Sequence, residues 1–461
     1  MKRNLTELAG WLQAAGQHMD DVMVMGVSLD SRTVKEGDLF IPFRGEQVNG
    51  HAYVERAIKQ GAAASLWLTD EPNPPAHLPL IFVEDSEAAL QEMARIYRDL
   101  LTCTIIGITG SNGKTSTKDI VASALSPYFN VRKTEGNYNN ELGLPMTILS
   151  LEEDTEIAVL ELGMSGFGEI SFLSKLAKPH IAVITNIGEA HLQDLGSRAG
   201  IARAKFEIID GLQEGSKLFY DGDEPLLQEL VGQQNAVEAI SFGYDKGAAL
   251  FLEEIESGDD GSRFSVSGLL DGDFTIPVYG AHQVKNALAA ILIANELSVS
   301  AQDIRTALCH ASLTDMRMQP VVIENGALVI NDAYNSAPTS IRAALAFIQE
   351  TNLRKNKWVV LADMLELGAE ERAFHEGLAD QIVAMDLEGV LLYGPRMKWL
   401  YEKLQQRNIE SQLIWSEKDF SPIKDVLRER TDEDSIVLLK GSRGMALERL
   451  LAELKGEEDG Q

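Results

Sequence analysis

Short apolar runs rich in branched residues alternate, along most of the chain, with segments whose apolar positions recur every three or four residues. The first pattern is typical of buried parallel strands and the second of amphipathic helices. Ile105, Ile106 and Ile108 form one such strand, and Ile120 and Val121 begin the helical pattern that follows it. Repeated alternation of this kind predicts an α/β protein with mostly parallel sheets.

The order of these segments predicts three domains, as does the length of 461 residues. We expect an N-terminal α/β domain over residues 1–100, a central domain with a mostly parallel sheet over 101–312, and a C-terminal Rossmann-like domain over 313–461. In the last domain we expect strands at 321–323, 328–331, 358–361, 389–393 and 436–439, and helices at 339–349, 371–385, 395–406 and 445–454. A helix at 86–101, with Ser86 as its N-cap, ends the first domain.

A glycine-rich turn joins the strand at 105–108 to its helix. In such a turn backbone N–H groups close around an anion, the helix N-terminus adds a favourable dipole, and a lysine reaches the outer phosphates. The usual P-loop would need its first glycine at Ile108, so this is a shorter Thr-Gly-x-x-Gly-Lys-Thr form. The candidate phosphate-binding residues are Thr109, Gly110, Ser111, Asn112, Gly113, Lys114, Thr115 and Ser116, and the Thr115 hydroxyl is placed to ligate Mg²⁺.

Other polar residues follow predicted strands or lie within helices. Glu161 ends a buried strand beside the turn, where a metal ligand is expected. His191 lies in the loop after the next strand and is either structural or part of a site. Lys205 lies on the apolar side of a helix over 197–212, where the alternative is a lysine whose stem covers the core while its amine reaches water. His282 and Asn286 open another helix, as caps or as contacts to a base.

Three loops of the sequence have both a turn interpretation and a binding interpretation. Asn137, Asn139 and Asn140 are frequent turn residues that also suit a sugar or a phosphate. Ser31 and Arg32 fit a surface turn as well as a phosphate or uracil contact. Polar clusters at 331–335, 362–366 and 440–444 follow strands of the C-terminal domain, at the edge where such sheets bind ligands. No Gly-x-Gly-x-x-Gly motif is present, so NAD is not inferred.

The composition narrows the possible partners. A net charge of −29 argues against nucleic acid and against an anionic membrane surface. No apolar run approaches the length of a membrane span, and the N-terminus resembles an amphipathic helix rather than a signal peptide, so we expect a cytoplasmic protein without membrane insertion. Cys103 and Cys309 have no metal-binding spacing, and we expect both to be small buried residues.

Taken together, the motifs resemble those of the Mur ligases, the ATP-dependent amide-forming enzymes of peptidoglycan synthesis. The resemblance covers nearly the whole chain. Its motifs are Thr-Gly-Ser-Asn-Gly-Lys-Thr-Ser-Thr (109–117), Gly-Asn-Tyr-Asn-Asn-Glu-Leu-Gly-Leu-Pro (136–145), Asn-Asp-Ala-Tyr-Asn-Ser-Ala-Pro (331–338), Ala-Asp-Met-Leu-Glu-Leu-Gly (362–368) and Leu-Lys-Gly-Ser-Arg (439–443). Within the family these motifs are most similar to those of the members that add D-alanyl-D-alanine to UDP-N-acetylmuramoyl-tripeptide. The Asp-Asn-Pro-Arg-type signature of the members that add the third residue is absent.

The resemblance implies roles for individual residues. Lys114 and the turn would hold the ATP phosphates, with Thr115 and Glu161 on one Mg²⁺ and His191 on a second. Lys205 occupies the position of the family's carbamylated lysine. In the same way the resemblance places His282 and Asn286 at the adenine, Arg317 at the γ-phosphate and Asp332 at the ribose. Lys114, Lys205, His191 and Arg317 are the implied catalytic residues.

The resemblance also implies substrate contacts. The UDP-binding N-terminal domain would use Ser31, Arg32, Asn49 and His51, although the family often has Asp-Gly-His where this chain has Asn49-Gly50-His51. Asn137, Asn139 and Asn140 would face the sugar phosphate. Tyr334, Asn335, Lys440, Ser442 and Arg443 of the C-terminal domain would contact the peptide substrates.

The implied reaction makes an acyl phosphate from ATP and a carboxylate, and the amine of D-alanyl-D-alanine then displaces phosphate. Two alternatives stay open. A related ligase with another acceptor, such as a folylpolyglutamate synthetase, shares the phosphate loop, but its Asp-Tyr-Ala-His-Asn-Pro motif is replaced here by Asn-Asp-Ala-Tyr-Asn-Ser. A regulatory P-loop switch that only binds and hydrolyses ATP is the second alternative. We expect a monomer.

Overall fold

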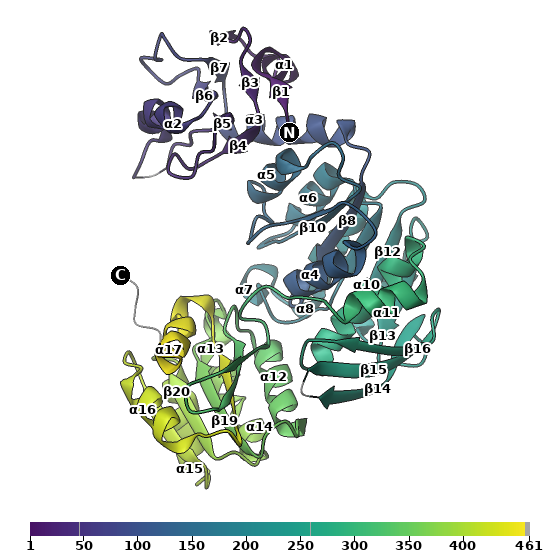
Figure 1. Cartoon of the computed structure of the whole chain (residues 1–461), viewed down its shortest axis with the longest axis vertical. Helices are drawn as coiled ribbons and strands as arrows, with labels where there is room; N and C mark the ends of the chain where they lie inside the picture. Colours follow the sequence, from purple (N-terminus) through teal and green to yellow (C-terminus); the bar gives the residue numbers. More distant parts are fainter. Residues whose placement is uncertain (46, 259, 457–461) are drawn as a thin grey trace.

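The chain folds into three lobes that follow one another in sequence and form an open C (Figure 1). The computed structural model describes residues 1–45, 47–258 and 260–456. The N-terminal and C-terminal lobes lie at opposite ends of the central lobe (Figure 1). None of the helices described is both long enough and apolar enough to cross a membrane.

The N-terminal lobe holds a five-stranded sheet in the order β2-β7-β6-β5-β4 and a separate β1–β3 pair. Its strands are β1 (Arg3–Asn4), β2 (Gly16–Gln17), β3 (Met23–Val24), β4 (Gly26–Ser28), β5 (Asp38–Phe40), β6 (Ala64–Leu68) and β7 (Leu80–Val83). Its helices are α1 (Leu5–Trp11), η1 (Gly50–Tyr53), α2 (Val54–Gln60) and α3 (Ser86–Leu100). Strands β4 to β7 are parallel, β2 pairs antiparallel with β7, and β1 pairs antiparallel with β3.

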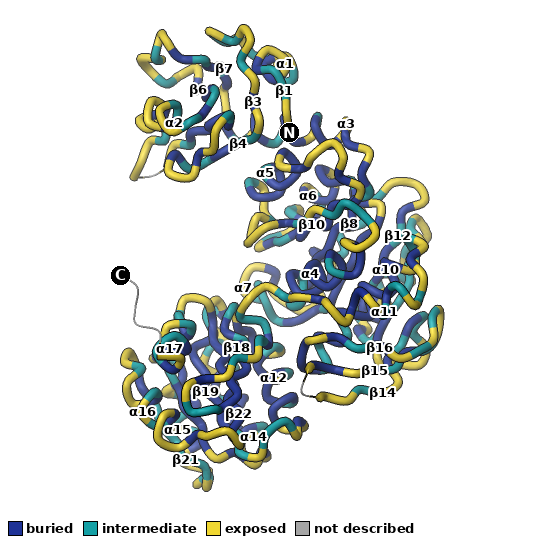
Figure 2. The backbone as a smooth tube through the Cα atoms, in the orientation of Figure 1, coloured by how far each residue is buried: buried dark blue, intermediate teal, exposed yellow. Residues whose placement is uncertain are grey.

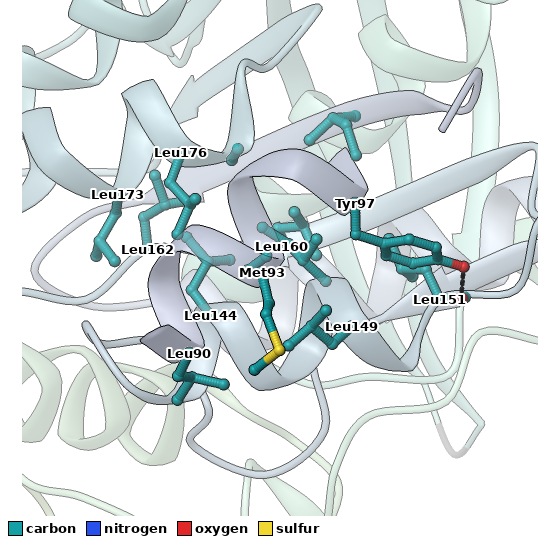
Figure 3. Packing of buried hydrophobic residues seen from close by; sticks show 14 of the residues in the cluster. Leu90, Met93, Tyr97, Leu144, Leu149, Leu151, Leu160, Leu162, Leu173 and Leu176 are labelled. Atoms are coloured by element: carbon teal, nitrogen blue, oxygen red, sulfur yellow. Dashed lines mark hydrogen bonds between the residues drawn. The ribbon is translucent and has the colours of Figure 1, made fainter. Parts of the chain in front are cut away.

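Helix α3 packs on both the N-terminal and the central lobe. Leu90, Met93 and Tyr97 of this helix share a buried cluster with residues of the central lobe (Figure 3). The Tyr97 hydroxyl donates to the Leu151 carbonyl oxygen at 2.8 Å. The prediction that Ser86 caps α3 is wrong, because the Asp85 carboxylate accepts from the first free N–H groups of the helix. The continuous core ties the first two lobes together.

The central lobe is built on a nine-stranded sheet in the order β16-β15-β14-β13-β12-β11-β8-β10-β9. The strands are β8 (Thr104–Thr109), β9 (Val131–Lys133), β10 (Ile157–Glu161), β11 (Ile181–Ile184), β12 (Lys217–Asp221), β13 (Glu238–Gly243), β14 (Leu250–Gly258), β15 (Gly261–Gly268) and β16 (Gly272–Ile276). All pairs from β9 to β14 are parallel, and β15 and β16 add an antiparallel end. Its helices are α4 (Lys114–Leu125), α5 (Gly143–Ser150), α6 (Glu169–Ala177), α7 (Leu192–Leu195), α8 (Arg198–Phe206), η2 (Glu207–Gly211), α9 (Pro225–Gly232), α10 (Ala281–Glu296) and α11 (Ala301–Leu308).

The C-terminal lobe holds a six-stranded sheet in the order β17-β18-β22-β19-β20-β21, parallel except for β17. Its strands are β17 (Gln319–Val322), β18 (Leu328–Asp332), β19 (Asn356–Ala362), β20 (Gly389–Tyr393), β21 (Gln412–Ser416) and β22 (Ser435–Lys440). Its helices are α12 (Pro338–Glu350), η3 (Gly368–Glu370), α13 (Glu371–Glu376), α14 (Ala379–Val383), α15 (Met397–Gln406), α16 (Ser421–Arg430), η4 (Arg443–Met445) and α17 (Leu447–Leu454). Figure 2 shows buried strands surrounded by exposed loops.

The predicted α/β class and the mostly parallel sheets of the two later lobes are confirmed. The domain boundaries at 100/101 and 312/313 stay a prediction. Two further predictions were wrong in detail. The helix expected at 371–385 is divided into α13 and α14, because α13 ends in a cap at Gly377. Cys309 is exposed, since it caps the end of α11, whereas Cys103 is buried as expected.

Candidate functional site

The phosphate loop lies where β8 ends and α4 begins. Two of its glycines adopt positive φ, +153° at Gly110 and +79° at Gly113. A Cβ atom on Gly110 would lie 1.8 Å from Thr185 Oγ1, and one on Gly113 would lie 2.8 Å from Asn286 Oδ1. Both positions therefore require glycine, and the loop that they shape leads into a helix N-terminus, which favours binding of an anion such as a phosphate group.

The neighbouring strand β11 fixes the shape of the loop. Thr185 Oγ1 donates to the Asn112 carbonyl oxygen at 2.6 Å, and Asn186 Oδ1 accepts from the Asn112 N–H at 2.9 Å. Thr185 and Asn186 were missed as site residues by sequence reasoning. Their place directly after a strand next to β8 was the available signal, because parallel strands end at one edge of the sheet.

Lys114 Nζ donates to the Gly110 carbonyl oxygen at 2.8 Å and so closes over the loop. Burial lowers the pKa of Lys114, Arg317 lowers it further, and the negative charge of Glu161 opposes both effects. Lys114 and Arg317 therefore bring two positive charges to the loop.

Oxygen atoms that could ligate a metal ion lie beside the loop. Thr115 Oγ1 donates to Glu161 Oε2 at 2.8 Å, and Asn139 Nδ2 donates to the other carboxylate oxygen at 2.8 Å. Glu161 is 3% exposed. No group of three or more His, Cys, Asp or Glu side chains placed to hold a metal ion occurs among residues 1–45, 47–258 and 260–456. A hard cation such as Mg²⁺ needs few protein ligands, because it keeps waters and binds substrate phosphates.

Lys205 is buried in α8 with 1% of its surface exposed, so the alternative in which its amine reaches water is wrong. Burial lowers the pKa of Lys205 well below its usual value, and repulsion by Lys114 lowers it further. In the described part of the chain no acidic group pairs with this amine. His191, at a positive φ of +64°, has its pKa lowered by burial and by the charges of Lys205 and Lys114.

The C-terminal lobe faces the phosphate loop across a cavity of about 840 Å³. Arg317 Cζ lies 4.2 Å from the ring centre of Tyr334, and its buried Nε has no hydrogen-bond partner among the residues described. Lys440, 2% exposed, forms an ion pair of 2.5 Å with Asp332 and donates to the Asn335 carbonyl oxygen at 3.2 Å. All five of these residues line the cavity.

The start of α10 forms another part of the cavity wall. Burial lowers the pKa of His282 to about 4, although the charge of Asp332 opposes the shift. Asn286 Nδ2 donates to Gln283 Oε1 at 3.1 Å, so the amide oxygen is turned toward Gly113. The structure thus places His282 and Asn286 in the same cavity wall as the phosphate loop, and their role at a base stays a prediction.

The remaining cavity wall comes from the loop after β9 and from α3. Asn137, Asn139 and Asn140 line it, as do Glu87 and Gln91 of α3. Glu87 and Gln91 were missed by sequence reasoning, because nothing in the pattern of α3 showed that this helix leaves the N-terminal lobe to pack against the central one.

The predicted N-terminal contacts do not line this cavity. Arg32 forms an exposed ion pair with Asp30. His51 is bonded internally, because its Nδ1 lies 2.9 Å from Asn49 Oδ1 and its Nε2 accepts from the Leu68 N–H at 3.2 Å. Burial lowers the pKa of His51. Ser31 is also buried.

Two predicted residues of the C-terminal lobe also lie outside the cavity wall. Ser442 Oγ accepts from the Leu365 N–H at 2.9 Å and so fixes the loop after β19. Arg443 forms an ion pair of 2.9 Å with Glu448.

A phosphate loop on a parallel sheet, faced by charged side chains from a separate Rossmann-like lobe, defines a nucleotide-dependent enzyme of several lobes. Comparison with known families agrees with this class. The profile of the Mur ligase middle domain matches residues 108–294, that of the Mur ligase, glutamate ligase domain matches 316–443, and that of the Mur ligase family, catalytic domain matches 23–98. The chain belongs to the Mur ligase family.

Individual relatives cover the full length. The UDP-N-acetylmuramoyl-tripeptide–D-alanyl-D-alanine ligase of Bacillus subtilis (strain 168) is 40% identical over 98% of this chain and 97% of its own. A crystal structure of MurF from Acinetobacter baumannii is similar with a TM-score of 0.89 and 28% identity, covering 99% of both chains. A structure of MurF ligase from Thermotoga maritima in complex with ADP has a TM-score of 0.83 and 28% identity, covering 95% of this chain and 99% of that one.

Proposed function

We propose that this chain is an ATP-dependent ligase that adds D-alanyl-D-alanine to UDP-N-acetylmuramoyl-tripeptide. The observation that carries the proposal is one cavity lined both by the phosphate loop of the central lobe and by Arg317 of the C-terminal lobe. The full-length similarity to a D-alanyl-D-alanine-adding ligase supports the choice of substrates.

ATP fits the residues present. Ser111 Oγ and Asn112 Nδ2 are buried in the loop without a hydrogen-bond partner in the described part of the chain, and residues 111–116 line the cavity. Lys114 would exchange its bond to the Gly110 carbonyl for a bond to phosphate oxygens. His282 and Asn286 would face the base, and Asp332 the ribose.

Mg²⁺ fits the oxygen donors of Thr115 and Glu161, with His191 as a candidate ligand for a second ion. Bound there, magnesium would neutralise charge on the phosphate oxygens. The chain's own part is to hold Glu161 in place, through Thr115 on one carboxylate oxygen and Asn139 on the other.

The chemistry converts a poor acyl donor into a good one. A carboxylate oxygen of the muramoyl peptide attacks the γ-phosphorus, the bond to ADP breaks, and an acyl phosphate forms. The amine of D-alanyl-D-alanine then attacks the carbonyl carbon, loses a proton and expels phosphate, which leaves an amide. Lys114 and Arg317 would neutralise the charge that develops on the phosphoryl group, and the cavity between the lobes would keep water from the acyl phosphate.

We further propose that Lys205 acts as a carbamate. Burial, a lowered pKa and the lack of an acidic partner in the described part of the chain favour the neutral, nucleophilic form of this amine. Its Nζ would add to carbon dioxide and release one proton. The product carries a negative charge, which Lys114 and any bound cation would stabilise. This reaction turns an unfavourable buried amine into a carboxylate-like ligand.

The assignment of the lobes is part of the proposal. Residues 1–100 would bind the UDP part through Ser31, Arg32, Asn49 and His51, and residues 313–461 would supply Tyr334, Asn335, Lys440, Ser442 and Arg443 to the peptide substrates. In the structure Asn49 and His51 hold each other, so a role in binding would act through the loop that they shape. We propose a monomer as the active species.

The test is phosphate release from ATP with each substrate omitted in turn. We expect release only when the muramoyl tripeptide and D-alanyl-D-alanine are both present, with one amide product per phosphate by mass spectrometry. Release that needs ATP alone would contradict the ligase and favour a P-loop switch. Release that requires another acceptor would favour a related ligase.

A further inference from the structure

Helix α4 carries a buried carboxylate five residues after the phosphate-loop lysine. Asp119 is completely buried. Its Oδ1 accepts from Lys133 Nζ at 2.7 Å and lies 3.7 Å from Lys118 Nζ. Its Oδ2 accepts from both the backbone N–H of Thr314, at 2.8 Å, and the Thr314 hydroxyl, at 2.7 Å.

The two carboxylate oxygens therefore have different tasks. Oδ1 balances the cations of Lys118 and Lys133, which belong to the central lobe. Oδ2 accepts two hydrogen bonds from Thr314. Thr314 lies in the segment between α11 and β17, the linker that joins the central to the C-terminal lobe. A buried carboxylate is costly unless it is fully paired, and here the linker supplies half of the pairing.

The linker leads directly to the active-site arginine. Arg317 follows Thr314 by three residues and precedes β17, so the path from the attachment point to the guanidinium is short. Arg317 lies over the ring of Tyr334, and its Nε lacks a hydrogen-bond partner within the described ranges. The arginine thus packs against an aromatic face, while its Nε stays available to a ligand.

Through Lys118, Asp119 is also connected to Glu161, the candidate metal ligand. Lys118 Nζ donates to the Thr134 carbonyl oxygen at 2.7 Å, and the Thr134 hydroxyl accepts from the Glu161 N–H at 3.0 Å. One buried network therefore reaches from the linker to the residues beside the phosphate loop.

We propose that Asp119 is a positioning residue: it holds the linker at Thr314 against α4 and so fixes the point about which the C-terminal lobe presents Arg317 to the phosphate loop. The proposal rests on the proposed function, since it assigns Arg317 to the transferred phosphate. The short path from Thr314 transmits any displacement of the linker to the guanidinium, while the loop that binds ATP belongs to the central lobe alone.

Two substitutions test this, with a matched control in the same segment. Asp119→Asn keeps the shape of the side chain but removes its charge and puts an NH₂ group among donors. Thr314→Val removes the hydroxyl bond to Asp119 at an exposed position but keeps the backbone N–H bond, so we expect the fold to be kept. Ser312→Ala changes an exposed linker side chain that does not contact Asp119. All three are also made in an Arg317→Ala background.

The measurements are kcat, the Kd of a non-hydrolysable ATP analogue by calorimetry, and the radius of gyration by X-ray scattering with and without the analogue and the muramoyl tripeptide. We expect kcat to fall about 5-fold for Thr314→Val, the loss typical of one ordinary hydrogen bond, and about 30-fold for Asp119→Asn, a loss within the range for one hydrogen bond to a charged group. The Kd should stay within about 2-fold, and the ligand-dependent change in radius should be reduced. Ser312→Ala should match the wild type.

The Arg317→Ala background separates positioning from a general structural role. If Asp119 acts through Arg317, its substitution should add less than about a 2-fold loss in that background. A full loss in that background, a kcat equal to that of Ser312→Ala, or a Kd that weakens in step with kcat would overturn the proposal. If Asp119→Asn does not fold, Thr314→Val decides. If the wild type itself lacks substrate-dependent phosphate release, the proposed function fails, and the scattering and Kd results still test whether Asp119 holds the linker.

Discussion

Gly110→Ala tests whether the phosphate loop depends on the absence of one methyl group. The added Cβ would lie 1.8 Å from Thr185 Oγ1, 3.1 Å from Thr185 Cβ and 3.3 Å from the Asn112 carbonyl oxygen. Thr185 cannot turn away freely, because it is 2% exposed and its hydroxyl donates to Asn112 at 2.6 Å. The loop or the threonine must therefore move.

Three contributions set the magnitude. Forcing a methyl group into a packed site costs about 1–3 kcal/mol. Breaking the bond between Thr185 and Asn112 costs about 1 kcal/mol. The positive φ of +153° at Gly110 costs a non-glycine residue about 1–3 kcal/mol. If about 3 kcal/mol of this total is relieved by displacing the loop from its ligand-binding shape, ATP affinity falls by about 100-fold.

The assay is calorimetric titration with a non-hydrolysable ATP analogue, alongside urea unfolding. Gly215→Ala is the matched control, because Gly215 has a φ of +84° but no neighbour within 4 Å of an added Cβ. The control should lose stability of about 1 kcal/mol and keep its affinity. Thr185→Ala removes the colliding oxygen, so the double variant with Gly110→Ala should bind more tightly than Gly110→Ala alone. Equal affinity of Gly110→Ala and the wild type, or equal weakening by Gly215→Ala, would refute the reasoning.

Three further predictions concern other parts of the chain. Lys205→Ala should lose activity by at least about 100-fold without rescue by bicarbonate. With ¹³C-labelled bicarbonate, only the wild type should give a carbamate signal in its NMR spectrum. Near-normal turnover of the variant would show that the lysine is structural. Because burial lowers the pKa of His51, the unfolded state takes up the proton first as the pH falls below about 6.5, and stability is lost there. His51→Gln should remove part of that loss between pH 6.5 and 5, as measured by urea unfolding at each pH, whereas His77→Gln, at an exposed position, should leave it unchanged. Tyr97→Phe should reduce the free energy of unfolding by about 1 kcal/mol, since it removes the buried bond to the Leu151 carbonyl; an unchanged urea midpoint would show that this bond contributes nothing.

The parts of the fold that could be predicted are those encoded by contiguous residues. The β8–loop–α4 unit is visible in 20 or so neighbouring positions, because a buried strand, two glycines and a lysine leave a local pattern. The same holds for most strands of the C-terminal lobe. The two elements missed there, β21 and α16, are bordered by polar residues, and β21 is an edge strand buried on fewer sides.

Packing between lobes left no such pattern. Helix α3 reads as an ordinary amphipathic helix, and only the structure shows that its apolar side joins the central core and that Gln91 reaches the cavity. The same limit applies to Thr185, whose importance lies in one contact with Asn112 across two strands. Such contacts depend on which strands are neighbours in the sheet, and this order cannot be read from the sequence of a parallel sheet.

Charged residues also differ in whether neighbouring positions in the sequence reveal their role. The phosphate-loop lysine has a recognisable neighbourhood, but the meaning of a buried Asp119 depends on a linker residue nearly two hundred positions later. A carboxylate at that place in α4 looks like any exposed helix position until burial and its partners are known. The bonds from Thr314 and the two lysines offset the cost of burying this carboxylate. On the proposal made above, the bond between the linker and α4 therefore stabilises the folded state, and we expect motion of the C-terminal lobe to take place beyond Thr314.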